Sequence, residues 1–91
     1  MIRSFRHRGL KRLWEGDPSR IGAALRDRIE NALAVLDAAA TSADLDLPGY
    51  RLHALKGDLK GTWSVTLSGN WRITFRVERG NVFDVDLTDY H

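Results

Sequence analysis

The chain lacks cysteine and is poor in proline and methionine. Its 91 residues include no cysteine, two prolines and one methionine. Without cysteine it forms no disulfide and no thiolate metal site, which fits a reducing compartment such as the cytoplasm. No apolar run approaches the roughly 20 residues that a membrane-spanning helix needs, so we expect no membrane partner.

Several signatures of enzyme sites are also missing. The chain has no glycine-rich Walker or dinucleotide-binding loop and no nucleophile elbow centred on serine. Its three histidines are scattered and do not have the spacing of zinc ligands. We therefore expect a protein without a bound metal or cofactor.

The composition suits one small globular domain over residues 1–91. The hydrophobic fraction is 43%, enough for one modest core. The net charge of +2 hides a basic N-terminus. Its cations are Arg3, Arg6, Arg8, Lys11 and Arg12. Such a cluster is typical of a surface that meets RNA phosphates, although an ordinary charged helix gives the same pattern.

The N-terminal half reads as a short strand followed by two helices. Residues 1–5 favour a strand, and residues 7–15 favour a helix that ends at Gly16. The apolar stripe of this helix is Leu10, Leu13 and Trp14. Asp17 and Pro18 look like the start of a second helix that continues to about residue 40. Residues 41–50 form a loop with a Pro-Gly turn.

The C-terminal half predicts an antiparallel sheet. Apolar and polar residues alternate over 63–67, 71–77 and 83–87, with Phe83 expected on the apolar face. Paired residues must share a face, which favours three-residue loops at 68–70 and 79–81. The fold class is then α+β, with two N-terminal helices packed on one face of a small antiparallel sheet.

This register also predicts which side chains meet across the strands. Asp89 falls beside Trp71, at the open end of the apolar face. On the other face the expected pairs are Arg72 with Thr88, Thr74 with Asp86, and Arg76 with Asp84. One face of the sheet therefore meets the helices and the other carries charge.

A group of polar residues contains every part that a metal-free ribonuclease needs. Such an enzyme deprotonates a 2′-hydroxyl, neutralises charge on the phosphoryl oxygens and protonates the leaving 5′-oxygen. Histidine, aspartate and tyrosine move protons, lysine and arginine supply positive charge, and an aromatic ring stacks on a base. The candidates are His53, Lys56, Arg72, Asp89, Tyr90 and His91.

Taken singly, these residues have simpler interpretations. His53 suits a hydrogen-bonded structural histidine, Lys56 a solvated cation, and Arg72 an arginine paired with an acid on the sheet. If residues 50–60 turn helically, His53 and Lys56 share one side because they are three residues apart. The whole set, ending in the tripeptide 89–91, favours the catalytic interpretation.

Three stretches together resemble a known family of toxins. They are LHALKGD at 52–58, GNWRITF at 69–75 and the terminal DYH at 89–91. With the opening MIRSFRHRGLKRLWEGD, the chain resembles over its whole length the HigB toxins, or plasmid-maintenance killer proteins, of the RelE/ParE superfamily. The resemblance implies a microbial-RNase-like fold and a cytoplasmic toxin of a type II toxin–antitoxin pair.

The resemblance also implies an activity and partners. Family members cleave mRNA in the ribosomal A site without a metal, and their antitoxin is a HigA-type protein with a helix-turn-helix domain. Toxin and antitoxin together bind operator DNA. The functional positions of the family match the six candidates above, and the N-terminal cations would dock ribosomal RNA.

We expect Arg72 and Lys56 to hold the scissile phosphate. His91 or Asp89 moves protons, His53 is a second acid–base candidate, and Tyr90 orients or stacks on a codon base. Two other functions stay open from the sequence. One is a ParE-like inhibitor of gyrase, and the other is a weakly active or non-catalytic partner-binding module of the same fold.

Overall fold

The computed structural model describes residues 1–89 of the chain, so the candidates Tyr90 and His91 lie outside the described residues. Among residues 1–89, no helix combines the length and the apolar character that crossing a membrane requires. The elements, in chain order, are α1 (Arg8–Trp14), α2 (Ala23–Ala38), the 3₁₀ helix η1 (Ser42–Leu45), β1 (His53–Ala54), the 3₁₀ helix η2 (Gly57–Leu59), β2 (Trp63–Ser68), β3 (Trp71–Glu78) and β4 (Asn81–Asp89).

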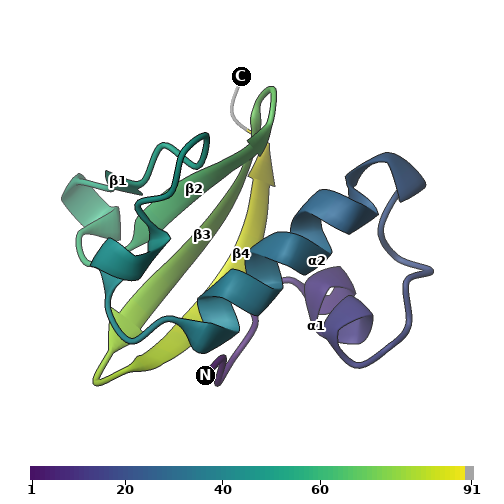
Figure 1. Cartoon of the computed structure of the whole chain (residues 1–91), viewed down its shortest axis with the longest axis horizontal. Helices are drawn as coiled ribbons and strands as arrows, with labels where there is room; N and C mark the ends of the chain where they lie inside the picture. Colours follow the sequence, from purple (N-terminus) through teal and green to yellow (C-terminus); the bar gives the residue numbers. More distant parts are fainter. Residues whose placement is uncertain (90–91) are drawn as a thin grey trace.

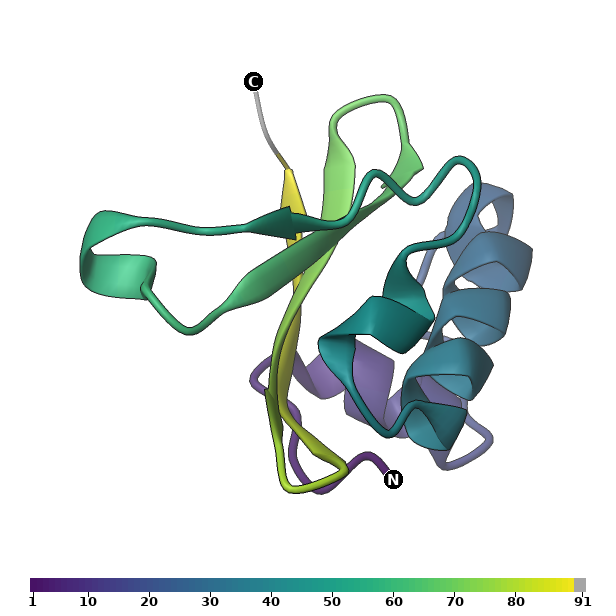
Figure 2. The ribbon, with the colours of Figure 1, turned by 60° about the vertical axis from the view of Figure 1, so that its left-hand side comes forward.

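The described elements form two layers. The strands make one antiparallel sheet in the order β1-β2-β3-β4, and both α-helices cover the same face of it (Figure 1, Figure 2). The core between the layers includes Leu10, Ile29, Leu33, Ile73 and Phe75, all fully buried. This arrangement confirms the predicted α+β fold class.

The N-terminal segment lies along the outer edge of β4, in parallel with it. Ile2 bridges Val82 and Phe5 bridges Val85. The Arg3 N–H donates to the Val82 carbonyl at 2.7 Å, and the Val82 N–H donates to the Met1 carbonyl at 2.9 Å. These bonds satisfy backbone groups that an exposed edge strand would leave open. The expected N-terminal strand is therefore present as bridged, extended chain.

The first helix ends where the sequence predicts, but one of its apolar residues is exposed. Gly16 follows the helix with a φ of +104°, a conformation that glycine adopts without strain. At the start, the His7 Nδ1 atom accepts a hydrogen bond from the Leu10 N–H at 3.1 Å. Leu10 and Leu13 are buried, whereas Trp14 is 41% exposed. Trp14 thus belongs to the surface and not to the predicted apolar stripe.

The second helix begins five residues later than predicted. Asp17 accepts a hydrogen bond from the Ser19 N–H at 3.0 Å, which closes a local turn. The helix starts at Ala23 after Gly22, and Gly22 has no side chain to cap it. The Asp-Pro pair therefore closes a turn that precedes the buried Ile21, and the predicted N-cap of α2 at Asp17 is wrong, because the N-cap is Gly22.

The register between β2 and β3 matches the prediction through Thr66. Val65 lies opposite Ile73, and Thr66 lies opposite Arg72. Beyond Thr66 the register shifts, so Ser68 pairs with Trp71 across a two-residue turn. Gly69 opens this turn with a φ of 54°. A bulge and a two-residue turn therefore replace the predicted three-residue loop at 68–70.

The β3–β4 hairpin differs more from the prediction. Glu78 pairs with Asn81, which leaves a two-residue turn in place of the predicted loop at 79–81. Arg79 and Gly80 have φ values of 50° and 78°, as a type I′ turn requires. This turn puts Arg76 opposite Phe83 and not opposite Asp84.

A bulge in β4 then restores the predicted register. Between Arg76 and Thr74 the partner changes from Phe83 to Asp86, so two residues of β4 oppose one residue of β3. Asp84 in the bulge has a φ of 57°. Val82 and Val85 are both fully buried, although they are three positions apart and would point to opposite faces of a regular strand. Phe83 therefore leaves the predicted apolar face, and Val82 takes its place in the core.

Candidate functional site

The face of the sheet turned away from the helices carries two of the six candidates, His53 and Arg72, among other polar residues. Cross-strand pairing places His53 opposite Ser64, and Ser64 opposite Thr74. The next row holds Thr66, Arg72 and Thr88. Since directly paired side chains lie about 5 Å apart on one face, these rows form a continuous polar surface.

A hollow on this face brings His53 and Arg72 together. Its volume is about 340 Å³, and its walls are Arg51, His53, Ser64, Thr66 and Arg72. We call it the Arg72 hollow. It joins two guanidinium groups, an imidazole and two hydroxyls, so it is suited to an anionic oxygen ligand.

Arg72 is held at the β2–β3 turn. Its Nη1 atom donates to the Gly69 carbonyl at 3.2 Å, and its side chain is half-buried. The register predicted from the sequence holds here, because Arg72 pairs with Thr88 and Trp71 pairs with Asp89. Asp89, at the end of β4, is therefore one residue along the strand from the partner of Arg72, and it is exposed.

Lys56 does not line the Arg72 hollow. His53 lies in β1 and Lys56 precedes η2, so the two do not share the side of a helix as residues three apart would. Both side chains are exposed. The chain from β1 through η2 extends away from the body of the molecule, on the side opposite the helices (Figure 2).

Arg51 is a site residue that the sequence analysis did not select. It lies two residues before His53 and lines the same hollow. Its φ of 49° is unusual for a residue other than glycine. Period-two spacing from His53 is the sequence signal that points to it, but β1 covers only His53–Ala54, too short for an alternating pattern to be visible.

Arg76 forms an ion-pair network farther along the same face. It pairs with Glu78, and its Nη1 atom lies 2.9 Å from an oxygen of Asp84. The predicted meeting of Arg76 and Asp84 is thus confirmed in space, although the bulge changes the strand register. Hydrogen bonds to Glu78 and then Asp84 raise the pKa of the Arg76 guanidinium, which stays charged.

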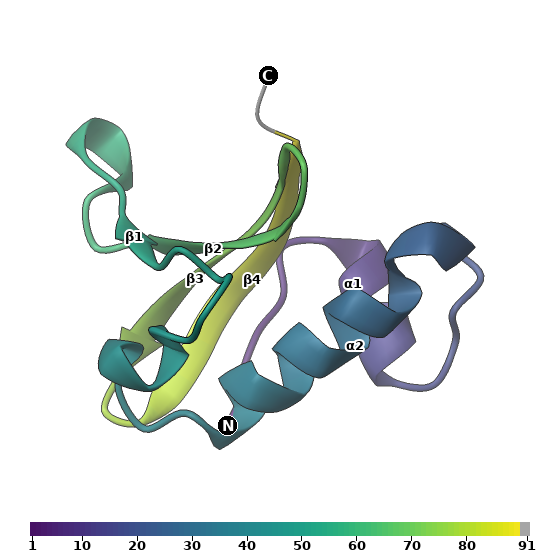
Figure 3. The same ribbon diagram turned by 45° about the horizontal axis from the view of Figure 1, so that its top comes forward.

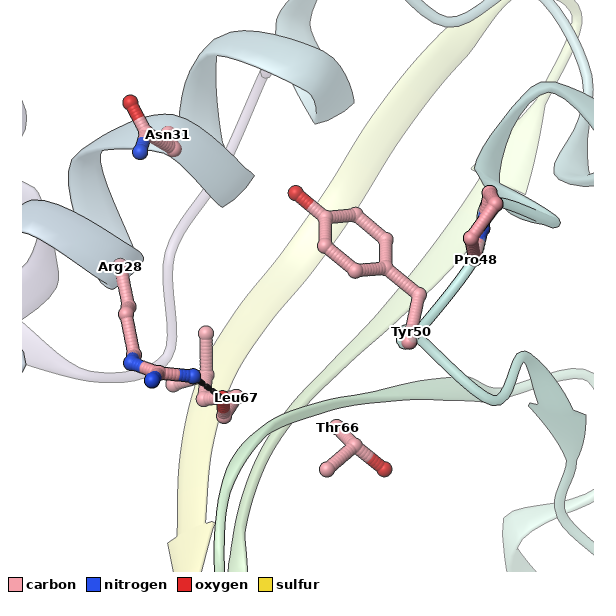
Figure 4. A pocket seen from close by; sticks show the side chains of 7 residues that line it. Arg28, Asn31, Pro48, Tyr50, Thr66 and Leu67 are labelled. Carbon is pink, nitrogen blue, oxygen red and sulfur yellow. Dashed lines mark hydrogen bonds between the residues drawn. The ribbon is translucent and has the colours of Figure 1, made fainter.

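Another hollow lies on the helix-covered side of β2. Figure 4 shows Tyr50 there with its ring toward α2, while Thr66 lies on the other side of the strand. The Arg28 Nη1 atom donates to the Leu67 carbonyl at 3.0 Å and ties α2 to the sheet. Burial raises the pKa of the Tyr50 hydroxyl, so Tyr50 stays neutral near pH 7. This hollow contains none of the predicted site residues.

The predicted basic patch divides into two parts. Four of its members border two adjoining hollows on α1 and the N-terminal segment, and exposed Trp14 lies among them. These four are Arg3, Arg8, Lys11 and Arg12. Arg6 instead lines a hollow on the polar face of the sheet. Trp14 is the feature that sequence reasoning assigned to the core.

The described residues offer no metal site. Within residues 1–89, no group of three or more histidines and carboxylates lies close enough to hold a metal ion. The donors that do gather around Arg72 are cationic or neutral, and a cation would be repelled by the arginines.

The comparisons with known proteins agree with the family resemblance. Residues 3–91 match the family model of HigB-like toxins, described as the RelE-like toxin of type II toxin-antitoxin system HigB. The chain is 45% identical over 92 residues to the endoribonuclease HigB of Proteus vulgaris, with 100% of both chains covered. It is 30% identical over 79 residues to toxin HigB-1 of Vibrio cholerae, covering 84% of this chain and 83% of the relative.

Solved structures support the fold independently of close sequence similarity. A mutant of the YafQ toxin from E. coli superposes with a TM-score of 0.67 at 15% identity, covering 98% of this chain and 91% of the other. The YoeB–YefM complex from Staphylococcus aureus gives 0.66 at 15% identity, covering 100% and 95%. With the match over residues 3–91, these findings establish that the chain belongs to the HigB-like family of RelE-like toxins of type II toxin–antitoxin systems.

Proposed function

We propose that this toxin is a metal-free endoribonuclease that cleaves mRNA in the ribosomal A site and so inhibits translation. The observation that carries the proposal is the Arg72 hollow, where Arg51, His53 and Arg72 line one concave surface. Fixed cations beside an imidazole suit a phosphodiester that gains charge as it reacts. The relative from Proteus vulgaris, 45% identical, is named an endoribonuclease.

In the proposed reaction, the 2′-hydroxyl attacks the adjacent phosphorus atom. A base takes the hydroxyl proton, and an acid gives a proton to the leaving 5′-oxygen. The products are a 2′,3′-cyclic phosphate and a 5′-hydroxyl end. Arg72 binds the phosphate with its guanidinium fork, and Lys56 adds a second positive charge.

The proton-moving groups come from the last residues of the chain and from β1. His91 or Asp89 transfers the protons, with His53 as a second acid–base candidate. Tyr90 orients or stacks on a codon base. The set titrates as a unit if these groups interact, so pH–rate profiles report the set and not one residue.

The open shape of the site supports the proposed dependence on the ribosome. His53 and Lys56 are exposed, and the Lys56 side chain does not border the hollow that holds Arg72. Binding to the ribosome would bring the mRNA and the β1–β2 connection, which carries Lys56, close to Arg72. Such an induced fit would complete the site. A ribosomal target also places the toxin in the cytoplasm.

The partner is an antitoxin, as membership of a type II family implies. We propose the HigA type, with a helix-turn-helix domain, and operator DNA binding by the toxin–antitoxin complex only. The YoeB neighbour was solved as a complex with YefM. YefM is the partner of YoeB. For this chain, that complex supports only the expectation that the partner is a protein.

The proposal is tested by incubating the toxin with mRNA on programmed ribosomes and with the same mRNA alone. We expect cleavage only with ribosomes, and we expect His91→Ala to slow it at least about tenfold, since positioned acid–base groups contribute that much or more. If His91→Ala cleaves at the wild-type rate, the catalytic site must lie elsewhere. A wild-type toxin that cleaves nothing but inhibits gyrase would favour the ParE-like function.

A second expectation concerns the basic surface on α1. Lys11 borders both hollows there and is exposed. If it meets ribosomal RNA, Lys11→Ala should weaken ribosome binding and lower the slope of log affinity against log salt by about one. Sedimentation at several salt concentrations measures this, with Arg20→Ala in the 17–22 loop as the control. An unchanged slope for Lys11→Ala would assign docking to another surface.

A further inference from the structure

A second hollow lies on the polar face of the sheet, directly beside the Arg72 hollow. Its floor is Thr74 of β3 with Asp86 and Thr88 of β4, and we call it the Asp86 hollow. Thr74 lies opposite Ser64, and Thr88 lies opposite Arg72. Since Ser64 and Arg72 line the first hollow, the two hollows share a boundary across paired strands.

The wall of the Asp86 hollow is apolar and comes from the β1–β2 connection. Leu55 and Leu59 line it, and Leu59 is 48% exposed. The connection projects on the side of the sheet away from the helices (Figure 2, Figure 3). The apolar leucines can pack against the flat face of a ligand. The polar floor can form hydrogen bonds with the edge of the same ligand.

The charged side chains in the Asp86 hollow differ in how far their atoms are already hydrogen-bonded. Asp84 is bound to Arg76 at 2.9 Å and accepts the Ser4 hydroxyl at 3.5 Å. Arg6 also lines the hollow, so two arginines balance its two aspartates. Asp86 uses Oδ1 to accept the Leu87 N–H at 2.9 Å. Its second oxygen is the group that can accept a hydrogen bond from a ligand.

The hollow has the size of a small ligand. Its volume is about 190 Å³, below the range of about 300–1,000 Å³ that encloses drug-sized molecules. A single nucleobase is a flat ring system of this class, whereas a protein segment would need a longer groove. The adjoining Arg72 hollow supplies the phosphate-binding groups that a nucleotide also requires.

We infer that the Asp86 hollow is a base-recognition subsite for the RNA strand whose phosphate lies in the Arg72 hollow. The inference rests on the proposed ribonuclease function. Asp86 accepts a hydrogen bond from an exocyclic amino group, as found on adenine, cytosine and guanine. Uracil presents carbonyl oxygens at the corresponding edge positions, and a carboxylate repels them. Leu55 and Leu59 cover the face of the base.

The test is cleavage by Asp86→Asn on ribosomes programmed with mRNAs that carry each of the four bases at each codon position. The amide has the shape of the carboxylate, and its oxygen still accepts the Leu87 N–H, so the fold is kept. Because the asparagine amide also has an NH2 group, it can donate a hydrogen bond to a carbonyl oxygen of uracil. We expect the preference for amino-bearing bases over uracil to fall about tenfold at one codon position.

Asp46→Asn is the matched control, because Asp46 is exposed beside η1 and lines neither hollow. It should leave the codon profile unchanged. Leu59→Ala should slow cleavage of all codons without changing their order, since it removes the wall and not the polar edge.

Each other outcome counts against the subsite. A codon profile of Asp86→Asn identical to that of the wild type overturns it. An equal loss at all bases, with unchanged thermal stability, would assign Asp86 to a contact with the ribosome and also overturns it. A wild type that cleaves no mRNA would remove the proposed function itself, which is a distinguishable result.

Discussion

Arg72→Ala is expected to slow ribosome-dependent mRNA cleavage by at least about 100-fold. Removing one preorganised donor at a position of developing charge typically costs a factor of about 10²–10³ in rate. Arg72 projects from the polar face of the sheet, and its Nη1 atom donates to the Gly69 carbonyl at 3.2 Å. Folding stability should change by no more than about 1 kcal/mol, the usual range for partly exposed charged contacts.

Arg72→Lys separates charge from geometry. The lysine keeps the positive charge but lacks the planar fork that binds two phosphoryl oxygens. We expect its rate to lie between those of the wild type and Arg72→Ala. Arg20→Ala, in the exposed loop before α2, is the control and should cleave at the wild-type rate. If Arg72→Ala lowers the melting temperature as steeply as the rate, Arg72 is a structural residue and the proposed site is wrong.

The surroundings of Arg72 are predictable from the sequence because two simple rules apply there. Residues alternate in and out along β3 and β4, and paired residues share a face. These rules place Thr88 opposite Arg72 and Asp89 opposite Trp71, as the structure has them. The same rules fail at the hairpin end, because a bulge at Asp84 changes which residues face the core, whereas the sequence over 83–87 alternates as a regular strand would.

The β1 side of the site is less predictable for a different reason. β1 contains only His53 and Ala54, and both are exposed, so neither periodicity nor hydrophobicity marks it. It exists because β2 offers it an open edge, a tertiary cause that a local pattern does not record. A helical turn over this segment is the alternative that spacing alone suggests, and it would have paired His53 with Lys56 instead of Arg51.

At the start of α2, a sequence pattern that is typical of a helix N-terminus forms a turn instead. Asp17 followed by Pro18 is a strong helix-start pattern. In the structure the Asp17 side chain accepts the Ser19 N–H, and backbone hydrogen bonding of this kind lowers the pKa of the Asp17 carboxyl. The turn buries Ile21 against the core before the helix begins. Packing of Ile21, and not the cap, therefore decides where α2 starts.

Phe75→Ala is expected to have the largest effect on stability. Phe75 is fully buried between the sheet and the helices, and truncating a buried phenylalanine typically costs about 3–5 kcal/mol. That is a large part of the roughly 5–15 kcal/mol that stabilises a typical domain. Urea unfolding followed by circular dichroism measures the loss as a lower transition midpoint.

Phe83→Ala is the matched control, with the same truncation on the neighbouring strand. The alternating pattern of the sequence puts Phe83 in the core, whereas the bulge puts it outside the set of residues that form or border the core. We therefore expect a loss of about 1 kcal/mol or less for Phe83→Ala. Equal losses for the two variants would contradict the bulge, and would restore the three-residue loop at 79–81. Thr74 pairs with Asp86 on the far side of the bulge, as the unbulged register also predicts, so this comparison of two phenylalanines tests the hairpin end of the sheet and leaves the pairing beneath the proposed base subsite in place.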